Sequence, residues 1–269
     1  VAGIVNPINP LLEAEQISAI LRETKAKVVV TVKAFPKTDL AQKVAEAVKH
    51  APSVKTVLEV DLLRYLGGIK RLIVPLIRPK NPISHSANVK SFNAECRKQP
   101  ADRLIFKDNP ADRVTAYFHT GGTTGMPKVA QHKLSGMVYN GWLGARLLFR
   151  ETDVVMCPLP LFHVNASILS FYCMLLSGGC QVQTDRFQPS RWWAEVVQSR
   201  ATIVHYLGVV VPMLLGQAPG PFDRDHRVRF AIGAGVDPQR HAEFEQRFGF
   251  PLVEIWGMTE MVRAIFDSE

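Results

Sequence analysis

Short apolar runs alternate with amphipathic stretches along most of this chain. Leu12, Ile17, Ile20 and Leu21 recur at helical spacing, and the β-branched run 27–32 that follows predicts a buried strand. The alternation continues with strands expected at 54–60, 114–118, 128–131, 153–157, 181–184, 202–206, 228–232 and 252–255, and with helices expected at 39–49, 134–149, 166–176, 189–199, 209–215 and 238–248. Asp39 is expected to cap the first of these helices. Short strands separated by helices of about 10–15 residues indicate an α/β fold whose mainly parallel sheets are flanked by helices.

The stretch 61–82 breaks this alternation because it mixes aliphatic side chains with Arg64, Lys70, Arg71, Arg78 and Lys80. A basic amphipathic stretch can lie on an anionic membrane surface. Two glycines at 67 and 68 and a proline at 75 break any long helix. The sequence therefore favours a connector that packs on its own protein, with peripheral membrane contact as the alternative.

Three regions follow from this organisation. We expect residues 1–60 to form a first α/β subdomain that is incomplete at its start. Residues 61–105 form a connector or insertion, and residues 106–269 form a second α/β subdomain that is truncated at its end. The chain opens inside an expected strand and stops soon after a motif, so we expect it to be part of a longer polypeptide.

Composition narrows the classes of partner. The 269 residues are 47% hydrophobic, and 32 basic against 24 acidic residues give a formal charge of +8. The basic residues are scattered and no nucleic-acid-binding module is recognisable, so small polyanions such as ATP and CoA suit the charge better than nucleic acid. No apolar run reaches the roughly 18–20 residues that a membrane-spanning helix needs.

The cysteines indicate a reducing compartment. No Cys-x-x-Cys pair occurs among Cys96, Cys157, Cys173 and Cys180, and the last three lie in apolar sequence. We expect these three to be buried, reduced thiols, and a cytoplasmic location is the default.

The run Thr120-Gly121-Gly122-Thr123-Thr124-Gly125-Met126-Pro127-Lys128 carries the strongest chemical signal. Glycine allows the backbone to approach a ligand closely, and clustered N–H groups, hydroxyls and a lysine can surround phosphate oxygens. A plain turn between two strands is the competing interpretation. The density of hydroxyls and the Pro-Lys ending favour a polyphosphate-binding loop.

Two common nucleotide motifs are absent from the sequence. The Walker pattern needs Gly-Lys followed by Ser or Thr, whereas Lys128 follows Pro127 and precedes Val129. The run Gly233-Ala234-Gly235 begins like a dinucleotide fingerprint, but Pro238 takes the place of the third glycine. P-loop kinases and Rossmann dehydrogenases are therefore disfavoured.

The Thr-Gly-Gly-Thr-Thr-Gly-Met-Pro-Lys run resembles the signature loop of the adenylate-forming superfamily, which includes acyl-CoA synthetases, aryl-CoA ligases, luciferases and peptide-synthetase adenylation domains. The chain departs from that pattern at His119, Gly121 and Val129. Two further segments, Pro160 to Ala166 and Glu254 to Glu260, resemble later motifs of the same superfamily in the same order. Three matches in order make an accidental resemblance implausible.

The resemblance implies an ATP-dependent acyl-CoA synthetase. The carboxylate of an acid attacks the α-phosphorus of ATP, pyrophosphate leaves, and the acyl group passes to CoA. Thr120 to Gly125 and Lys128 are then expected to hold the β- and γ-phosphates, and Thr259 is expected to donate to the α-phosphate.

The other motif residues receive roles from the same resemblance. Glu260 is expected to bind Mg²⁺, which prefers oxygen ligands. Trp256, followed by Gly257, is expected to stack on adenine, with a core aromatic as its ordinary alternative. Gly233, Ala234 and Gly235 are expected to let the backbone approach the nucleotide or acyl group, the alternative being a simple strand-to-helix turn. His163 is expected at the entrance for the carboxylate, although a lone histidine is often structural.

Alternatives remain open at this point. An adenylation domain that loads a carrier-protein thiol shares these motifs, and so does a non-catalytic nucleotide-binding fragment. A phosphotransferase is a more distant alternative. The superfamily's small carboxy-terminal domain has no counterpart in this sequence, so the 269-residue chain by itself is expected to be inactive in thioester formation.

Overall fold

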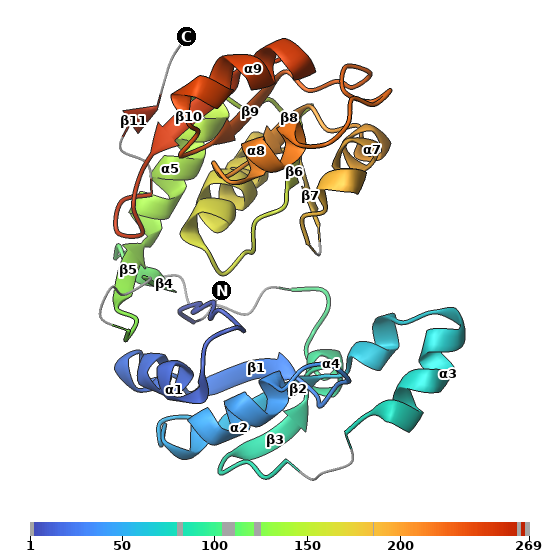
Figure 1. Cartoon of the computed structure of the whole chain (residues 1–269). Coiled ribbons are helices and arrows are strands. Elements are labelled where there is room, and N and C mark those ends of the chain that lie inside the picture. Colours follow the sequence, from blue (N-terminus) through green and yellow to red (C-terminus); the bar gives the residue numbers. More distant parts are fainter. Residues whose placement is uncertain are drawn as a thin grey trace. The chain divides into compact units, whose positions relative to one another are not determined.

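The computed structural model describes residues 3–79, 83–103, 111–120, 125–184 and 186–262, together with the backbone of 265–266. The chain divides into two compact units, one formed by Val1–Pro110 with His119–Ala130 and the other by Ala111–Phe118 with Gln131–Glu269. Each unit is an α/β structure in which helices flank a mainly parallel sheet (Figure 1), and this confirms the predicted fold class.

The first unit contains a three-stranded parallel sheet in the order β1-β2-β3. Its strands and helices are β1 (Val28–Val32), β2 (Thr56–Val60), β3 (Asn88–Ser91), α1 (Ala14–Glu23), α2 (Leu40–Lys49), η1 (Leu62–Tyr65), α3 (Gly68–Ile77) and α4 (Phe92–Arg97). Apolar residues of α1 and α2 pack against one face of the sheet around Val57, which is fully buried. Burial of these side chains supplies the main stabilisation of the unit.

The second unit is built on a six-stranded sheet in the order β11-β10-β9-β8-β6-β7. All neighbouring strands are parallel except β10 and β11. Its elements are β6 (Val154–Cys157), β7 (Cys180–Gln183), β8 (Ile203–His205), β9 (Phe230–Gly233), β10 (Leu252–Trp256), β11 (Ile265–Phe266), α5 (Leu134–Leu147), the π-helix η2 (Asn165–Tyr172), α6 (Cys173–Ser177), α7 (Pro189–Ser199), α8 (Val210–Leu215) and α9 (Pro238–Phe248).

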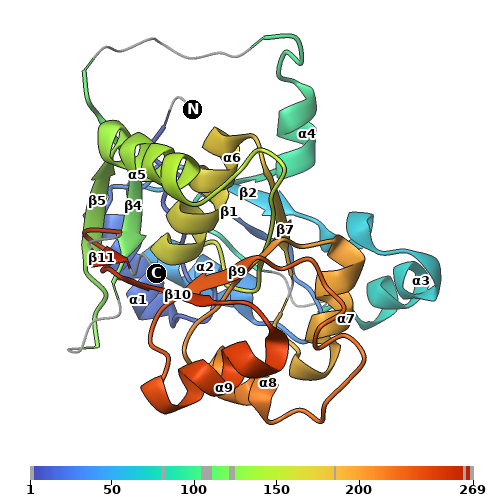
Figure 2. The same ribbon diagram turned by 90° about the horizontal axis from the view of Figure 1, so that it is seen from above.

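Successive residues of the central strands enter opposite faces of this sheet. Met156 and Val204 pack with α7, α8 and α9, whereas their neighbours Val155 and Ile203 pack with η2 and α6. Figure 2 shows the two helical layers on either side of the strands. Near-continuous apolar strands of this kind are expected when a parallel sheet is covered on both faces.

A two-stranded sheet, β4 (Val114–His119) with β5 (Val129–Lys133), has residues in both units. The hydrogen bond from Thr120 N to Lys128 O, 2.8 Å long, closes the base of the connection between the two strands. Residues 121–124 of that connection lie outside the described part of the chain.

Three sequence expectations need correction. The strand at 27–32 was expected to be buried, but Val28 and Val30 are 53% and 55% exposed because β1 is an edge strand with α1 and α2 on its other face. Cys180 is exposed on the edge strand β7, although Cys157 and Cys173 are buried as expected. Asp39 occupies the N-cap position of α2 without capping it, and its carboxylate lies 3.4 Å from Lys43 Nζ.

The stretch 61–82 also differs from its expected packing. It forms η1 and the ten-residue helix α3, and none of the residues of α3, all of which the structure describes, is buried. Strand β3 and helix α4, which follow this stretch, were not predicted from the sequence. No helix among the described residues is long and apolar enough to cross a membrane.

Candidate active site

The carboxyl ends of β9 and β10 bring two of the predicted motifs to one edge of the second unit. The two strands are parallel neighbours, with Gly233 opposite Glu254 in the register. Gly233-Ala234-Gly235 continues from β9, and Trp256-Gly257 ends β10 and continues beyond it. Ligands of open α/β sheets bind at such edges, because loops and backbone N–H groups converge there.

The glycine run is closely packed against the chain after β8. A Cβ on Gly233 would lie 2.3 Å from Tyr206 O, and a Cβ on Gly208 would lie 1.7 Å from Gly235 O. Gly235 itself has φ +81°, a conformation that residues with a Cβ rarely adopt. Gly208 N donates to Ala234 O over 2.8 Å. The run is therefore a tightly constrained turn that leaves its backbone at the sheet edge.

Glu254 fixes this turn, a role that sequence reasoning missed. Its Oε1 accepts a 2.8 Å hydrogen bond from Val236 N and lies 3.5 Å from Tyr206 Oη. Burial and the neighbouring Glu254 carboxylate both raise the pKa of Tyr206, which keeps the phenol protonated and able to donate. A carboxylate within the apolar strand Leu252–Trp256 was the available signal for this role.

Thr259 and Glu260 occupy the two central positions of a tight turn. Met258 N donates to Met261 O over 3.0 Å, and Met261 N donates to Met258 O over 3.1 Å. Glu260 is exposed at this turn and Thr259 is half-buried. The turn therefore presents a hydroxyl and a carboxylate side by side, just beyond the end of β10.

His132 of β5 supports the turn from behind. Its Nε2 lies 2.7 Å from Thr259 O, and its ring meets Phe118 edge-on at a centroid distance of 5.3 Å. Desolvation lowers the pKa of His132, whereas the Thr259 carbonyl and the Glu260 charge act in the opposite direction. A neutral imidazole donating from Nε2 to this carbonyl fits that environment. The contact joins residues 127 positions apart, and nothing in the sequence indicated it.

Trp256 is 55% exposed at the end of β10. Its side chain is therefore not the core aromatic that formed the ordinary alternative. A large aromatic face that remains open to solvent beside the glycine turn is able to stack on a planar ligand.

His163 lies in the segment after β6 and ends the turn that begins at Pro160 and leads into η2. Its backbone N donates to Pro160 O over 3.0 Å, and its Nδ1 accepts from Asn165 N over 3.4 Å. The side chain keeps access to solvent, and desolvation by the surrounding protein lowers its pKa. A neutral imidazole near the ends of β6 and β8 can accept or donate a hydrogen bond without carrying charge.

A buried polar group lies at the ends of β6 and β8. The Nδ1 atom of His205 is 2.6 Å from Ser170 Oγ and 3.7 Å from Cys157 Sγ. Burial, with a smaller effect of His163, lowers the pKa of His205 to about 3, and burial raises the pKa of the Cys157 thiol. All three groups are therefore neutral near pH 7. A histidine within the apolar run 202–206 was the only sequence signal of this group.

The described residues of the predicted phosphate loop belong to the first unit. Gly125 has φ +86° with open space where a Cβ would be, and its carbonyl accepts a 2.9 Å hydrogen bond from Gln16 Nε2. Lys128 is exposed. Gly121, Gly122, Thr123 and Thr124 lie outside the described residues. The backbone N–H of Asn9 donates to His119 Nε2 over 3.0 Å, which gives the histidine before the loop a structural role.

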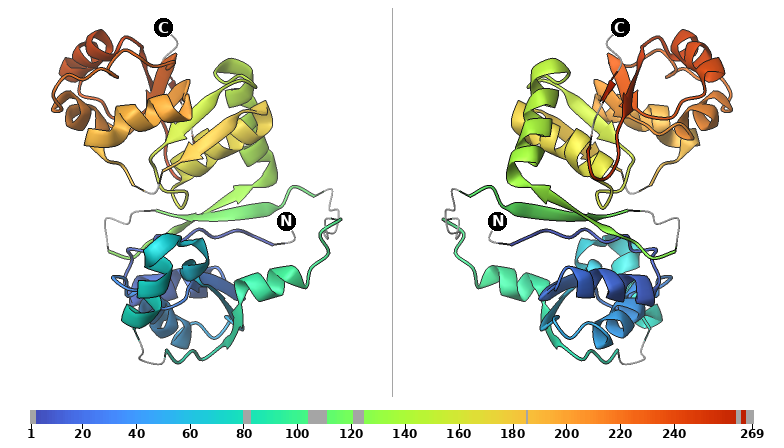
Figure 3. Two further views of the ribbon diagram at one scale, coloured as in Figure 1. Left: turned by 90° about the vertical axis from the view of Figure 1, so that its right-hand side faces the viewer. Right: turned by 90° about the vertical axis from the view of Figure 1, so that its left-hand side faces the viewer.

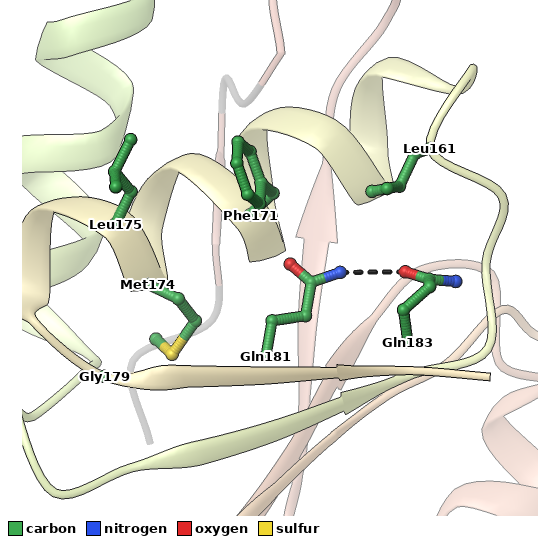
Figure 4. Close-up of a pocket in the computed structure, with 7 residues that line it drawn as sticks. All are labelled: Leu161, Phe171, Met174, Leu175, Gly179, Gln181 and Gln183. Atoms are coloured by element: carbon green, nitrogen blue, oxygen red, sulfur yellow. Dashed lines mark hydrogen bonds between the residues drawn. The ribbon is translucent and has the colours of Figure 1, made fainter. Parts of the chain in front are cut away.

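An open apolar pocket of about 330 Å³ lies elsewhere in the second unit. Figure 4 shows its lining by Leu161, Phe171, Met174, Leu175, Gly179, Gln181 and Gln183, with Gln181 Nε2 donating to Gln183 Oε1 over 2.8 Å. None of the site residues predicted from the sequence lines it. Among the described residues, no cluster of three or more His, Cys, Asp or Glu side chains is suited to hold a metal ion.

Comparisons with known proteins identify the family of this chain. The family model described as "AMP-binding enzyme" matches residues 1–268. The chain is 31% identical to the marinolic acid–CoA ligase of a Pseudoalteromonas strain, over 96% of the chain and 38% of that protein. It is 36% identical to the medium/long-chain-fatty-acid–CoA ligase FadD6 of Mycobacterium tuberculosis, over 49% of the chain and 23% of that protein. The chain therefore spans less than half the length of these relatives.

Solved structures show the same fold. A structure described as a putative long-chain-fatty-acid CoA ligase from Rhodopseudomonas palustris superposes with a TM-score of 0.74 at 19% identity, covering 98% of this chain and 59% of that one. The amino-terminal domain of FACL13 from Mycobacterium tuberculosis superposes with a TM-score of 0.71 at 18% identity, covering 96% of this chain and 57% of that one.

Proposed function

This chain belongs to the AMP-binding enzyme family, and from that premise we propose that it supplies the ATP- and acid-binding part of an acyl-CoA ligase. In the proposed reaction a carboxylate oxygen attacks the α-phosphorus of ATP and pyrophosphate leaves. The sulfur of CoA then attacks the acyl carbon, and AMP leaves. The observation that carries the proposal is the turn that presents Thr259 and Glu260 next to Trp256 and the glycine run.

In this proposal each motif binds a different part of the nucleotide. Trp256 stacks on adenine, and the backbone of Gly233, Ala234 and Gly235 approaches the nucleotide or the acyl group. The hydroxyl of Thr259 donates to the α-phosphate. The loop from Thr120 to Gly125, with Lys128, binds the β- and γ-phosphates and then pyrophosphate through N–H groups, hydroxyls and one positive charge.

The residues at the turn fit a magnesium ion that arrives with ATP. Mg²⁺ is usually held by one or two carboxylates together with substrate phosphates, and Glu260 offers one exposed carboxylate beside a threonine hydroxyl. When bound, the ion neutralises phosphate charge. In this proposal Glu260 holds the ion, and the bond from His132 to the Thr259 carbonyl keeps the turn in place.

The acid substrate is proposed to be a fatty or aromatic acid. The name of the matched Mycobacterium tuberculosis ligase refers to medium- and long-chain fatty acids, which supports an apolar acyl group. His163 orients the carboxylate at its entrance. His205 and Cys157 at the ends of β6 and β8 are neutral, so they place no fixed charge there that would repel the carboxylate or hold it too tightly. A cytoplasmic location remains a prediction from the sequence.

The test measures the affinity of the purified chain for a non-hydrolysable acyl-adenylate analogue by calorimetry. Replacing Trp256 by alanine is expected to weaken binding by about 1–3 kcal/mol, the usual contribution of a base stacked on an aromatic side chain. Trp142 is a matched control because it is 52% exposed, against 55% for Trp256, and lies on α5. Equal affinity of the Trp256→Ala variant and the parent would remove Trp256 from the adenine site. Failure of the parent to bind the analogue would contradict the proposed function.

A further inference from the structure

Helix α3 turns its apolar stripe away from the protein. Ile69, Leu72, Ile73, Leu76 and Ile77 recur at i, i+3, i+4, i+7 and i+8, so they form one continuous face of the helix. They are exposed by 70%, 73%, 43%, 76% and 57%. Such a stripe normally faces a core, and large exposed apolar patches usually mark interaction surfaces.

The orientation of α3 is fixed at both ends of its segment. Arg78, just after the helix, is ion-paired to Asp61 with 2.5 Å between Nη2 and Oδ1. The bond from Arg78 is also the main reason why the pKa of Asp61 is lowered. Arg64 on η1 donates to Asn93 Oδ1 over 2.6 Å, which ties η1 to α4. Figure 3 shows α3 at the outside of the first unit. Val74, on the opposite side of the helix from Leu72 and Leu76, is only half-buried.

The charged residues of α3, Lys70 and Arg71, are both basic. Residues 62–94 contain Arg64, Lys70, Arg71, Arg78, Lys80 and Lys90 and no acidic residue, although Arg78 is neutralised by its ion pair with Asp61. Lys70 and Arg71 lie on α3 itself and both are exposed. Lys70 borders the apolar stripe beside Ile77, whereas Arg71 is on the opposite face of the helix. A basic helix with an apolar face is the pattern of helices that lie in the plane of a membrane surface.

We propose that α3 is a membrane-docking helix that lies flat on an anionic phospholipid surface. The side chains of Leu72 and Leu76 enter the boundary between headgroups and acyl chains, while Lys70 at the edge of the stripe contacts lipid phosphates. A second copy of the chain is a poorer occupant, because two such faces would bring like charges together. This docking is independent of the proposed ligase activity.

Vesicle co-sedimentation of the full chain tests the proposal without ATP, acid or CoA. We compare vesicles of phosphatidylcholine alone with vesicles of equal parts phosphatidylcholine and phosphatidylglycerol. Binding is expected only to the second kind, and it should weaken as salt is added because the charges are screened. Absence of binding to the anionic vesicles would overturn the proposal.

Substitutions on α3 test whether this helix makes the contact with the membrane. Leu72→Ser with Leu76→Ser is expected to lower binding at least about tenfold, since each leucine loses the gain from leaving water. Leu11→Ser is the matched control, because Leu11 is 80% exposed in the same unit. Unchanged binding of the double variant, or equal loss in the Leu11→Ser variant, would overturn the assignment.

A charge variant keeps the test decisive if the leucine variant misfolds. Lys70→Glu is expected to lower binding to anionic vesicles more than about tenfold at low salt, because it replaces a favourable charge at the edge of the stripe by a repelled one. Circular dichroism checks the folding of every variant. Analytical ultracentrifugation addresses the competing occupant: a dimer that the leucine substitutions convert to a monomer, without vesicle binding by the parent, would show that α3 binds a second copy.

Discussion

Replacing Asp153 by asparagine is expected to lower the free energy of unfolding of the second unit by about 3 kcal/mol. Asp153 is 2% exposed. Its oxygens accept hydrogen bonds from Arg229 at 2.6 and 3.3 Å, from Thr202 Oγ1 at 2.7 Å and from Arg150 N at 2.8 Å. The carboxylate thereby links the chain before β6 to the segments that precede β8 and β9.

The size of the expected stability loss follows from the hydrogen bonds that an asparagine at position 153 cannot accept. Its single oxygen can still accept bonds from Thr202 or Arg150, but its NH₂ group faces the guanidinium of Arg229. Breaking a buried ion pair costs about 3–5 kcal/mol. The Arg229 side chain is 30% exposed and can regain water, which places the cost at the lower end of that range. For a unit of this size the melting temperature should fall by about 6–12 °C.

Tryptophan fluorescence during urea unfolding measures this effect in the correct unit. The protein contains four tryptophans, Trp142, Trp192, Trp193 and Trp256, and all lie in the second unit. Trp192 and Trp193 are buried in its core, so their emission should change when that core opens. The midpoint of the transition, at constant slope, reports the change in stability.

A surface ion pair provides the control. Arg240 and Glu243 on α9 are 2.8 Å apart, with side chains 50% and 51% exposed, so Glu243→Gln should cost less than about 0.5 kcal/mol. If Asp153→Asn unfolds within about 1 kcal/mol of the parent, or if both variants lose the same amount, the reasoning about this buried pair is refuted.

Four further predictions concern the site. Lys128→Ala should leave folding intact and weaken pyrophosphate binding by about 1.5–3 kcal/mol; unchanged calorimetric affinity would exclude its phosphate role. Glu260→Gln should raise the magnesium concentration needed for nucleotide binding, and an unshifted midpoint would refute that assignment. Gly208→Ala should displace the turn at Gly235 and destabilise the second unit by about 1–3 kcal/mol, so an unchanged unfolding midpoint would argue against this close packing. The 269 residues by themselves should form no acyl-CoA at a normal enzymatic rate. They span 38% of the matched marinolic acid–CoA ligase, and closure of an active site over its intermediate is needed to exclude water. Rapid formation of acyl-CoA would contradict this prediction.

Local sequence signals located most elements of the fold. The expected bounds of α7 and α9 agree with the structure residue for residue. Both helices begin with a proline at the first position, and Gly249 ends α9 with φ 81°. Strand β3 was missed because Asn88–Ser91 is exposed throughout and shows no apolar alternation. Its pairing with β2 depends on the fold around it.

Contacts across the sequence could not be predicted in the same way. The motif Trp256-Gly257-Met258-Thr259-Glu260 was identified by resemblance, but its support by His132 depends on a tertiary contact. The exposure of Cys180 follows from the edge position of β7, whereas the apolar sequence around it indicated burial. The sequence of α3 shows the helical spacing of its apolar residues, but it does not indicate that they face solvent.

Acid-dependent exchange of labelled pyrophosphate into ATP is the decisive measurement of carboxylate activation. The assay uses the complete translation product that contains this sequence, with magnesium and a panel of fatty and aromatic acids. We expect exchange that requires a carboxylic acid and that falls when Lys128 is replaced by alanine. Absence of acid-dependent exchange across the panel, with a folded protein, would contradict the claim that this site activates carboxylates.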